Sequence, residues 1–200
     1  MSGWWQQAWV GNDPDADAFA KVSRGICDLY SADLATANLQ HRVSTLRIFV
    51  GEVANTVGDQ AGNLPPATED GRAGVLAPTH TGSPASFEQA GISVPAGFAS
   101  WRVAEQQRCV LEAVHDAARG VAEFRRLPIA AFEHAREAVL VAGYTFTWSG
   151  PWKSSPGRRW RARCVFRTMP DGFGRLVLEV VASGDESVRA VSSEQISWTT

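Results

Sequence analysis

Residues 159–180, RWRARCVFRTMPDGFGRLVLEV, decide how the C-terminal half of this chain folds. Arginine or valine occupies the odd-numbered positions up to 167, and Trp, Ala, Cys and Phe occupy the even-numbered ones. A period of two is typical of a β-strand, and the Pro-Asp-Gly at 170–172 is a turn sequence. The pattern predicts a hairpin in which Arg163 faces Glu179 and the even-numbered side chains of both strands form the core face.

Further strands are expected on both sides of this hairpin. Tyr144, Phe146 and Trp148 alternate with threonines, which predicts a strand with one aromatic face. Val188 and Ala190, and also Ile196 to Trp198, indicate a last strand near the C-terminus. The C-terminal third is therefore predicted to be a four-stranded antiparallel meander laid against helices. A pocket between the aromatic strand and the helices would be lined by Tyr144, Phe146 and Trp148.

Two helices are predicted before the first of these strands. Residues 101–126 place apolar side chains on one helical face, at the spacing of three and four residues that an amphipathic helix requires. Pro128 then opens a shorter helix that Gly143 closes, because proline suits the first helical turn and glycine the position after the last.

Residues 19–57 carry an apolar side chain at every third or fourth position, which predicts a helical N-terminal half. Asn12 or Asp13 is a suitable N-cap, and Pro14 suits the first helical position. One long helix and two helices with a break near Ser31 both fit this pattern. The stripe is longer than a small domain can cover, so we expect it to serve as an assembly or partner-docking surface.

Three tryptophans, Trp4, Trp5 and Trp9, precede this stripe. They are expected either to cap the helical core or to anchor a partner, since exposed tryptophans promote association and aromatic residues concentrate at interfaces.

Residues 58–100 have a different character from the rest of the chain. They hold seven of the 18 glycines and five of the ten prolines, without sustained periodicity, which predicts a flexible linker or excursion. The expected organisation is an amphipathic helical segment at 1–57, the Gly/Pro-rich segment at 58–100 and an α+β domain at 101–200. The fold class is therefore predicted to be α+β.

Composition and charge exclude several classes of protein. An apolar content of 44% in 200 residues is enough for a core, and a net charge of −2 gives no overall field of one sign. Three widely spaced cysteines without a CxxC motif favour a reducing compartment. No apolar run is long enough to cross a bilayer, and the N-terminus lacks the basic start of a secretory signal. We expect a soluble cytoplasmic protein that has no cleaved leader and makes no membrane contact.

The arginine-rich strand is the most distinctive candidate for binding. Six basic residues and no acidic residue lie between positions 153 and 167. The candidates for binding an anion or a partner are Trp152, Lys153, Arg159, Arg161, Arg163 and Arg167. Such a surface suits nucleic acid or an anionic protein, and it equally suits the solvated face of a sheet on which Glu179 neutralises part of the charge.

Motifs for catalysis or metal binding find little support. Glu112-x-x-His115 and His134-x-x-Glu137 have a metal-ligand spacing, but Glu112 and His115 belong to a charged row that is predicted to face solvent. No nucleophile motif or nucleotide-binding glycine loop is present, and Cys109 and Cys164 are expected to be buried. We therefore expect no cofactor, metal or catalytic residue, and an enzyme is not favoured.

The leading functional hypothesis is a non-enzymatic interaction or assembly protein. It would use the 19–57 stripe and the arginine-rich strand face to bind a protein partner or a second copy. One alternative is nucleic-acid binding through residues 159–167. The other alternative is a small-molecule binder or enzyme with the aromatic pocket.

Overall fold

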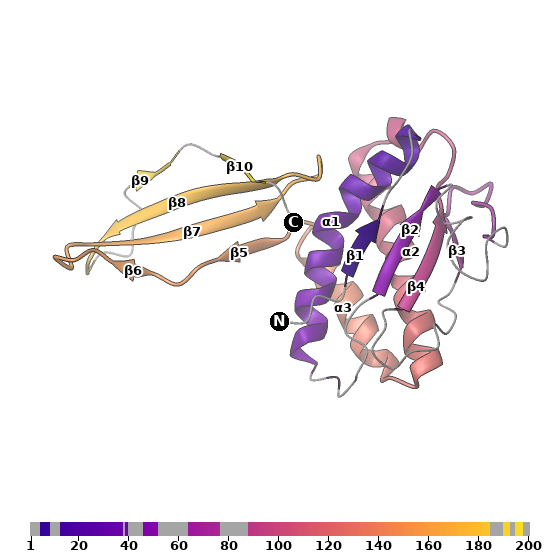
Figure 1. The fold of residues 1–200 in the computed structure, drawn as a ribbon, viewed down its shortest axis with the longest axis horizontal. Coiled ribbons are helices and arrows are strands. Elements are labelled where there is room, and N and C mark those ends of the chain that lie inside the picture. Colours follow the sequence, from indigo (N-terminus) through magenta and orange to yellow (C-terminus); the bar gives the residue numbers. More distant parts are fainter. Residues whose placement is uncertain are drawn as a thin grey trace.

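The computed structural model describes residues 5–8, 13–37, 39, 46–51, 64–76, 88–184, 190–192 and 195–197. These residues form an α+β protein with a body of helices and a mixed sheet and with an arm of antiparallel strands (Figure 1). The body comprises the described residues up to Tyr144, and the arm comprises those that follow. The arm projects from one side of the body. The predicted α+β class is confirmed.

The body sheet has the strand order β1-β2-β4-β3. Its strands are β1 (Trp5–Ala8), β2 (Leu46–Val50), β3 (Gly74–Leu76) and β4 (Glu88–Ser93). Strands β1, β2 and β4 run parallel, and β3 runs antiparallel to β4. Because α1 connects the parallel neighbours β1 and β2, the N-terminal segment is a βαβ unit. Of the three tryptophans, Trp4 and Trp9 lie outside the described residues, and only the backbone of Trp5 is described.

Helix α1 (Pro14–Thr36) begins where the sequence predicted. The Asp13 carboxylate accepts a hydrogen bond from the Asp15 amide at 2.9 Å, and Pro14 is the first helical residue. The helix continues through Ser31, so the alternative of two helices with a break there is wrong. Its apolar face is buried inside the body, which means that this part of the 19–57 stripe offers no docking surface.

The described part of the second half of the predicted stripe is not an α-helix. Residues 46–50 form strand β2, which lies between β1 and β4 and buries Leu46, Ile48, Phe49 and Val50. A strand that is buried on both faces has a nearly continuous apolar run instead of an alternating one. Such a run also satisfies a helical spacing, and the long-helix prediction failed for this reason. Val53 and Val57 lie outside the described residues.

The described part of residues 58–100 also differs from the linker prediction. Strands β3 and β4 lie in this range and pair with each other, and β4 pairs in parallel with β2. The short helix η2 (Phe98–Ser100) follows and buries Phe98 in the core. This Gly-rich segment is held in place by hydrogen bonds to neighbouring strands. Local sequence does not predict which strands will become neighbours, and for this reason the segment was expected to be a linker. Residues 58–63 and 77–87 lie outside the described residues.

The two remaining helices match their predictions. Helix α2 (Val103–Arg125) and helix α3 (Ile129–Val141) correspond to the ranges 101–126 and 128–143. Pro128 immediately precedes α3, and Gly143 follows it with a φ of +60° that favours glycine. None of the described helices is long and apolar enough to cross a membrane.

Tyr30 lies at the junction of the three helices. Its hydroxyl donates to the carbonyl oxygen of Phe132 on α3 at 3.0 Å and lies 2.9 Å from Nδ1 of His115 on α2. Because the hydroxyl proton goes to the carbonyl, His115 carries its proton on Nδ1 and donates to Tyr30. Burial raises the pKa of Tyr30 well above its ordinary value, so the phenol remains neutral and serves as a hydrogen-bonding bridge.

The arm is an antiparallel sheet built on the predicted hairpin. Its strands are β5 (Thr147–Ser149), β6 (Lys153–Ser154), β7 (Trp160–Thr168), β8 (Gly174–Ala182), β9 (Ala190–Val191) and β10 (Gln195–Ser197). Arg163 pairs with Glu179, as predicted. Strands β5 and β6 pair with β7, and β9 and β10 pair with β8, so each outer position holds two short strands. The predicted packing of this sheet against the helices is wrong, because only one end of the arm meets the body (Figure 1).

Replacing Tyr30 with phenylalanine tests the junction of the three helices. The change leaves the His115 Nδ1 and the Phe132 carbonyl without their shared partner in a buried site. We expect Tyr30→Phe to lower the free energy of unfolding by about 1–3 kcal/mol, measured by urea denaturation. Tyr144→Phe is the control, because no described group hydrogen-bonds to that hydroxyl. Equal stability of the two variants would contradict a structural role for the Tyr30 hydroxyl.

Candidate functional site

The arm is attached to helix α1 by its turn end. Arg24 donates from Nη1 to the Gly172 carbonyl at 2.9 Å, and the Thr168 hydroxyl donates to the Asp28 carboxylate at 3.3 Å. Gly172 has a φ of +79°, and a Cβ there would lie 2.8 Å from the backbone of Lys21, so this close approach requires glycine. The remainder of the arm extends away from the body.

The even face of the arm, defined as the face carrying the even-numbered residues of β7 and β8, is apolar and exposed. Trp148, which pairs with Phe166, belongs to the same face. Large apolar side chains remain 37–51% exposed on it: Trp148, Trp160, Leu176 and Leu178. The prediction that this is the core face is wrong, because no described element packs over it. Cys164, which was expected to be buried, is exposed for the same reason.

The odd face, which carries the odd-numbered residues of β7 and β8, is the better covered of the two. Val165 and Val181 are buried on it. The ring of Trp152 lies under the guanidinium groups of Arg161 and Arg163, at 5.6 and 4.7 Å from the ring centroid. Trp152 thus stacks with two arginines of the neighbouring strand, in the geometry of a cation–π contact.

Ion pairs use part of the arginine stripe. Arg163 Nε lies 2.7 Å from a carboxylate oxygen of Glu179 across the hairpin. Arg175, next to the turn, pairs with Asp171. These are the two acidic residues between positions 145 and 184, and each is paired with an arginine of the arm itself. The charge of the arm is therefore only partly neutralised from within.

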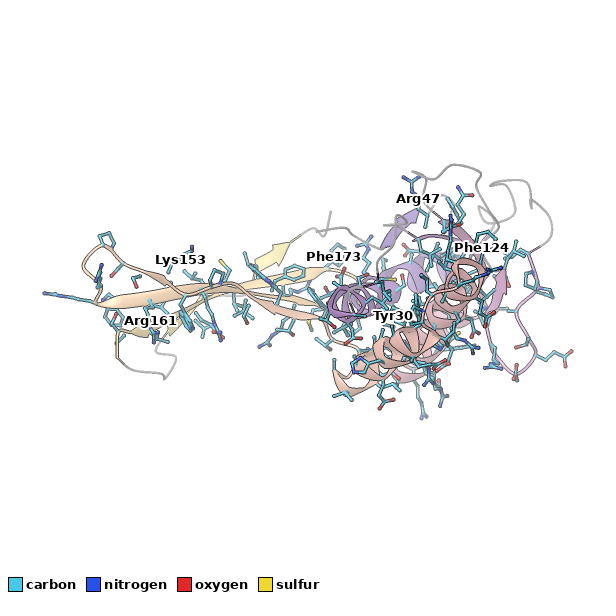
Figure 2. All side chains as sticks on the ribbon, turned by 90° about the horizontal axis from the view of Figure 1, so that it is seen from below. Tyr30, Arg47, Phe124, Lys153, Arg161 and Phe173 are labelled. Carbon is cyan, nitrogen blue, oxygen red and sulfur yellow. The ribbon has the colours of Figure 1, made fainter. Side chains whose placement is uncertain are left out.

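The structure brings together three of the six predicted anion-binding residues, namely Trp152, Arg161 and Arg163. Arg159 lies at the free end of the arm, and Arg167 is exposed toward the body end of β7. Lys153 pairs with Ala162 and so belongs to the even face. Figure 2 shows Lys153 and Arg161 on opposite sides of the arm.

The three predicted pocket residues have different surroundings in the structure. Strand β5 begins only at Thr147, so Tyr144 precedes it, with a positive φ of 61°. The Tyr144 side chain packs against the body core. Phe146 makes an edge contact with Phe166, with 6.4 Å between the ring centroids. Trp148 is half exposed on the even face.

Sequence reasoning missed a cleft of about 740 Å³ in the body. It lies between the segment before β3, the first half of α2 and Arg136 of α3. Trp101 forms one wall, and acidic side chains outnumber the three arginines around it: Glu69, Asp70, Glu105, Glu112 and Asp116. Arg136 pairs with Glu112 at 2.5 Å, which leaves a polar and mainly acidic surface. No sequence signal indicates this cleft, because its walls come from three segments separated by many residues.

The charged row on α2 does not simply face solvent as predicted. His115 is only 4% exposed, and its Nε2 lies 3.3 Å from Glu133 of α3. Arg119 also reaches Glu133, so the row forms a polar seam between α2 and α3. Burial lowers the pKa of His115, which favours the neutral ring. Among the described residues, no group of His, Cys, Asp and Glu has an arrangement that could hold a metal ion.

Two of the three cysteines lie in the body. Cys27 is buried, and its burial raises the pKa of the thiol far above the ordinary value, which makes it unreactive. Cys109 is half-buried and donates to the Gly71 carbonyl at 3.7 Å. Neither cysteine is paired with a histidine in the described structure, so neither forms the nucleophile–base arrangement that covalent catalysis uses.

Comparison with known proteins adds no assignment to this geometry. No family model matches the chain, and neither the curated proteins nor the solved structures contain a match. The candidate site therefore rests on the arm itself.

Asp28 gives the attachment of the arm a measurable dependence on pH. Burial raises the pKa of Asp28 to about 6, and its hydrogen bond from Thr168 and the charge of Arg24 only partly oppose this. The pKa of Asp28 is higher in the folded state than in the unfolded state, so protonation of this carboxyl group stabilises the folded state. This stabilisation is complete below about pH 4 and is lost as pH rises through about 6. We expect Asp28→Asn to be more stable than the wild type at pH 7, by on the order of 1 kcal/mol, with the difference vanishing near pH 4.

Thermal unfolding followed by circular dichroism between these two pH values measures this difference. Asp116→Asn, which changes an exposed carboxylate on α2, serves as the control. If the difference in stability between the wild type and Asp28→Asn stayed constant with pH, it would contradict the raised pKa assigned to Asp28.

Proposed function

We propose that this chain is a non-enzymatic assembly protein whose arm binds, through its even face, the even face of a second copy. The observation that carries the proposal is the exposure of Trp148, Trp160, Leu176 and Leu178 on one face of a sheet that projects from the body. Antiparallel sheets ordinarily bury one apolar face and solvate the other. In this chain the more apolar face is the uncovered one.

The size of the face sets the strength of the expected contact. A nine-residue strand is about 30 Å long, and four strand positions are about 19 Å wide. Two such faces would bury roughly 1,100 Å² in total, which lies near the lower limit for specific interfaces. We therefore expect a dimer that forms reversibly and whose population depends on concentration.

The distribution of charge favours a second copy as the occupant of this face. The arginines of β7 all lie on the odd face, and Lys153 is the one charged residue placed on the even face within the described residues. An acidic partner would be attracted to the other side of the sheet. A second even face can cover the apolar side chains while it leaves every arginine in water.

A twofold arrangement also matches the geometry of the hairpin. Cys164 is the central residue of β7, and it pairs with Leu178, the central residue of β8. Two even faces that pack in antiparallel orientation place this pair near the twofold axis. The tryptophan near the free end of one arm, Trp160, then meets the body-end half of the other arm.

A charged residue at the centre of the even face tests the proposal. We expect the wild type to rise from 21.6 kDa toward twice that mass as concentration increases, because apolar burial drives the contact. Leu178→Asp should remain monomeric, because two carboxylates would be buried near the axis. Sedimentation equilibrium and light scattering measure the masses.

Val141→Asp is the matched control, since Val141 is exposed on the body and 81% accessible. This variant should associate as the wild type does. A wild type that remains monomeric at every concentration would overturn the proposal, as would a Leu178→Asp variant that associates normally.

Cys164 provides a second, geometric test. If two copies meet near this residue, mild oxidation should link them through a Cys164 disulfide, and Cys164→Ser should abolish the link. Cys27 is buried and Cys109 is half-buried, so neither competes strongly. Non-reducing electrophoresis reads the result. Cross-linking that persists in Cys164→Ser would argue against the face-to-face arrangement.

A further inference from the structure

The odd face and the free end of the arm carry cations that the arm does not neutralise. Between residues 145 and 184 the chain has seven basic and two acidic residues, and both acids are paired with arginines. Four arginines of this surface form no ion pair with any described residue: Arg158, Arg159, Arg161 and Arg167. The surface therefore has positive charge available for an outside anion.

Arg161 is held in place before any ligand binds. Its guanidinium lies over Trp152, whose other contact, Arg163, is fixed by Glu179. The Nε of Arg161 is enclosed and has no hydrogen-bond partner within the described structure. A planar guanidinium that is stacked and partly desolvated offers its outer nitrogens as a fork, the geometry that suits a phosphate group.

The arginines follow the direction of one strand. Alternate residues of a β-strand recur on the same face about every 6.8 Å. Positions 159, 161, 163 and 167 therefore mark a line about 27 Å long from the free end toward the body. A flexible polymer with a negative charge on every repeat can follow such a line and contact several of these cations at once.

The width of the sheet decides between a single strand and a duplex. In the half near the free end, β6 and β9 flank the hairpin, so the sheet is four strands wide. The outer strands are then about 14 Å apart, before their side chains are counted. The major groove of B-DNA is about 12 Å wide and admits a two-stranded ribbon, so the arm is too broad to enter it.

We propose that the odd face and free end of the arm bind the phosphate backbone of single-stranded nucleic acid, with Arg161 as the central contact. Arg158, Arg159 and Arg167 extend the contact along the arm. Trp152 is a positioning residue that orients Arg161. The site does not depend on self-association, because even-face packing leaves the odd face of both copies exposed.

Binding of a short, labelled, mixed-sequence oligodeoxynucleotide to the full chain, followed by fluorescence anisotropy, tests the proposal. With four phosphate contacts, affinity should fall roughly 50-fold between ~50 and ~200 mM salt. Arg161→Gln should weaken binding and reduce the log–log salt slope by about 0.7. Arg119→Gln, which makes the same charge change in the body, should leave both quantities unchanged.

Trp152→Leu separates positioning from charge. It should weaken binding at every salt concentration while the slope stays the same, because the cations remain but Arg161 is no longer oriented. Circular dichroism checks that each variant keeps its fold, and a variant that unfolds is replaced by Arg159→Gln, which changes an exposed residue of the free end.

Three results would overturn the proposal. The first is that the oligonucleotide does not bind at ~50 mM salt. The second is that the duplex form of the oligonucleotide binds as tightly as the single strand. The third is that polyglutamate competes as strongly as unlabelled oligonucleotide, which would favour an acidic protein as the partner. The proposed self-association stands or falls separately. Leu178→Asp should still bind the oligonucleotide as a monomer, and a wild type that binds it without dimerising would refute only the assembly function.

Discussion

The hydroxyl of Tyr30 joins helix α1 to both α2 and α3, and the rest of the structure depends on where α1 lies. This helix buries its apolar face in the body core, and it also carries the residues that attach the arm. Asp28 reaches Thr168 of the arm, whereas Tyr30, two residues later, reaches His115 and Phe132. Residues two apart on a helix point in different directions, so one helix fixes both the core and the base of the arm.

Local signals predicted those parts of the fold that are determined locally. The hairpin register followed from its turn and its alternating residues, and α3 followed from Pro128 and Gly143. Strand β2 could not be recognised, because a strand between two parallel neighbours is buried on both faces and loses its alternation. The cleft around Trp101 depends on segments that meet only after folding, which no local pattern indicates.

Alternation along the arm predicted its two faces but not which of them would be covered. Trp160, Leu176 and Leu178 have the chemistry of a core face, and the sequence interpretation assigned them to one. Which face is covered depends instead on the position of the loop before β6. This loop lies on the odd face, because its Trp152 stacks with arginines there. The alternation of apolar and polar residues therefore predicts that a sheet has one apolar face. Which face is covered, and by which element, is determined by tertiary packing.

The two faces of the arm respond in opposite ways to salt, and this difference allows their roles to be separated. Apolar burial on the even face does not depend on charge, and excluded salts such as sulfate strengthen it. Cations of the odd face gain from releasing counterions and are screened as ionic strength rises. An association that tightens in sulfate must involve Leu178 and its neighbours. Binding that weakens as ionic strength rises must involve the arginines around Trp152, because the even face has no comparable charge among its described residues.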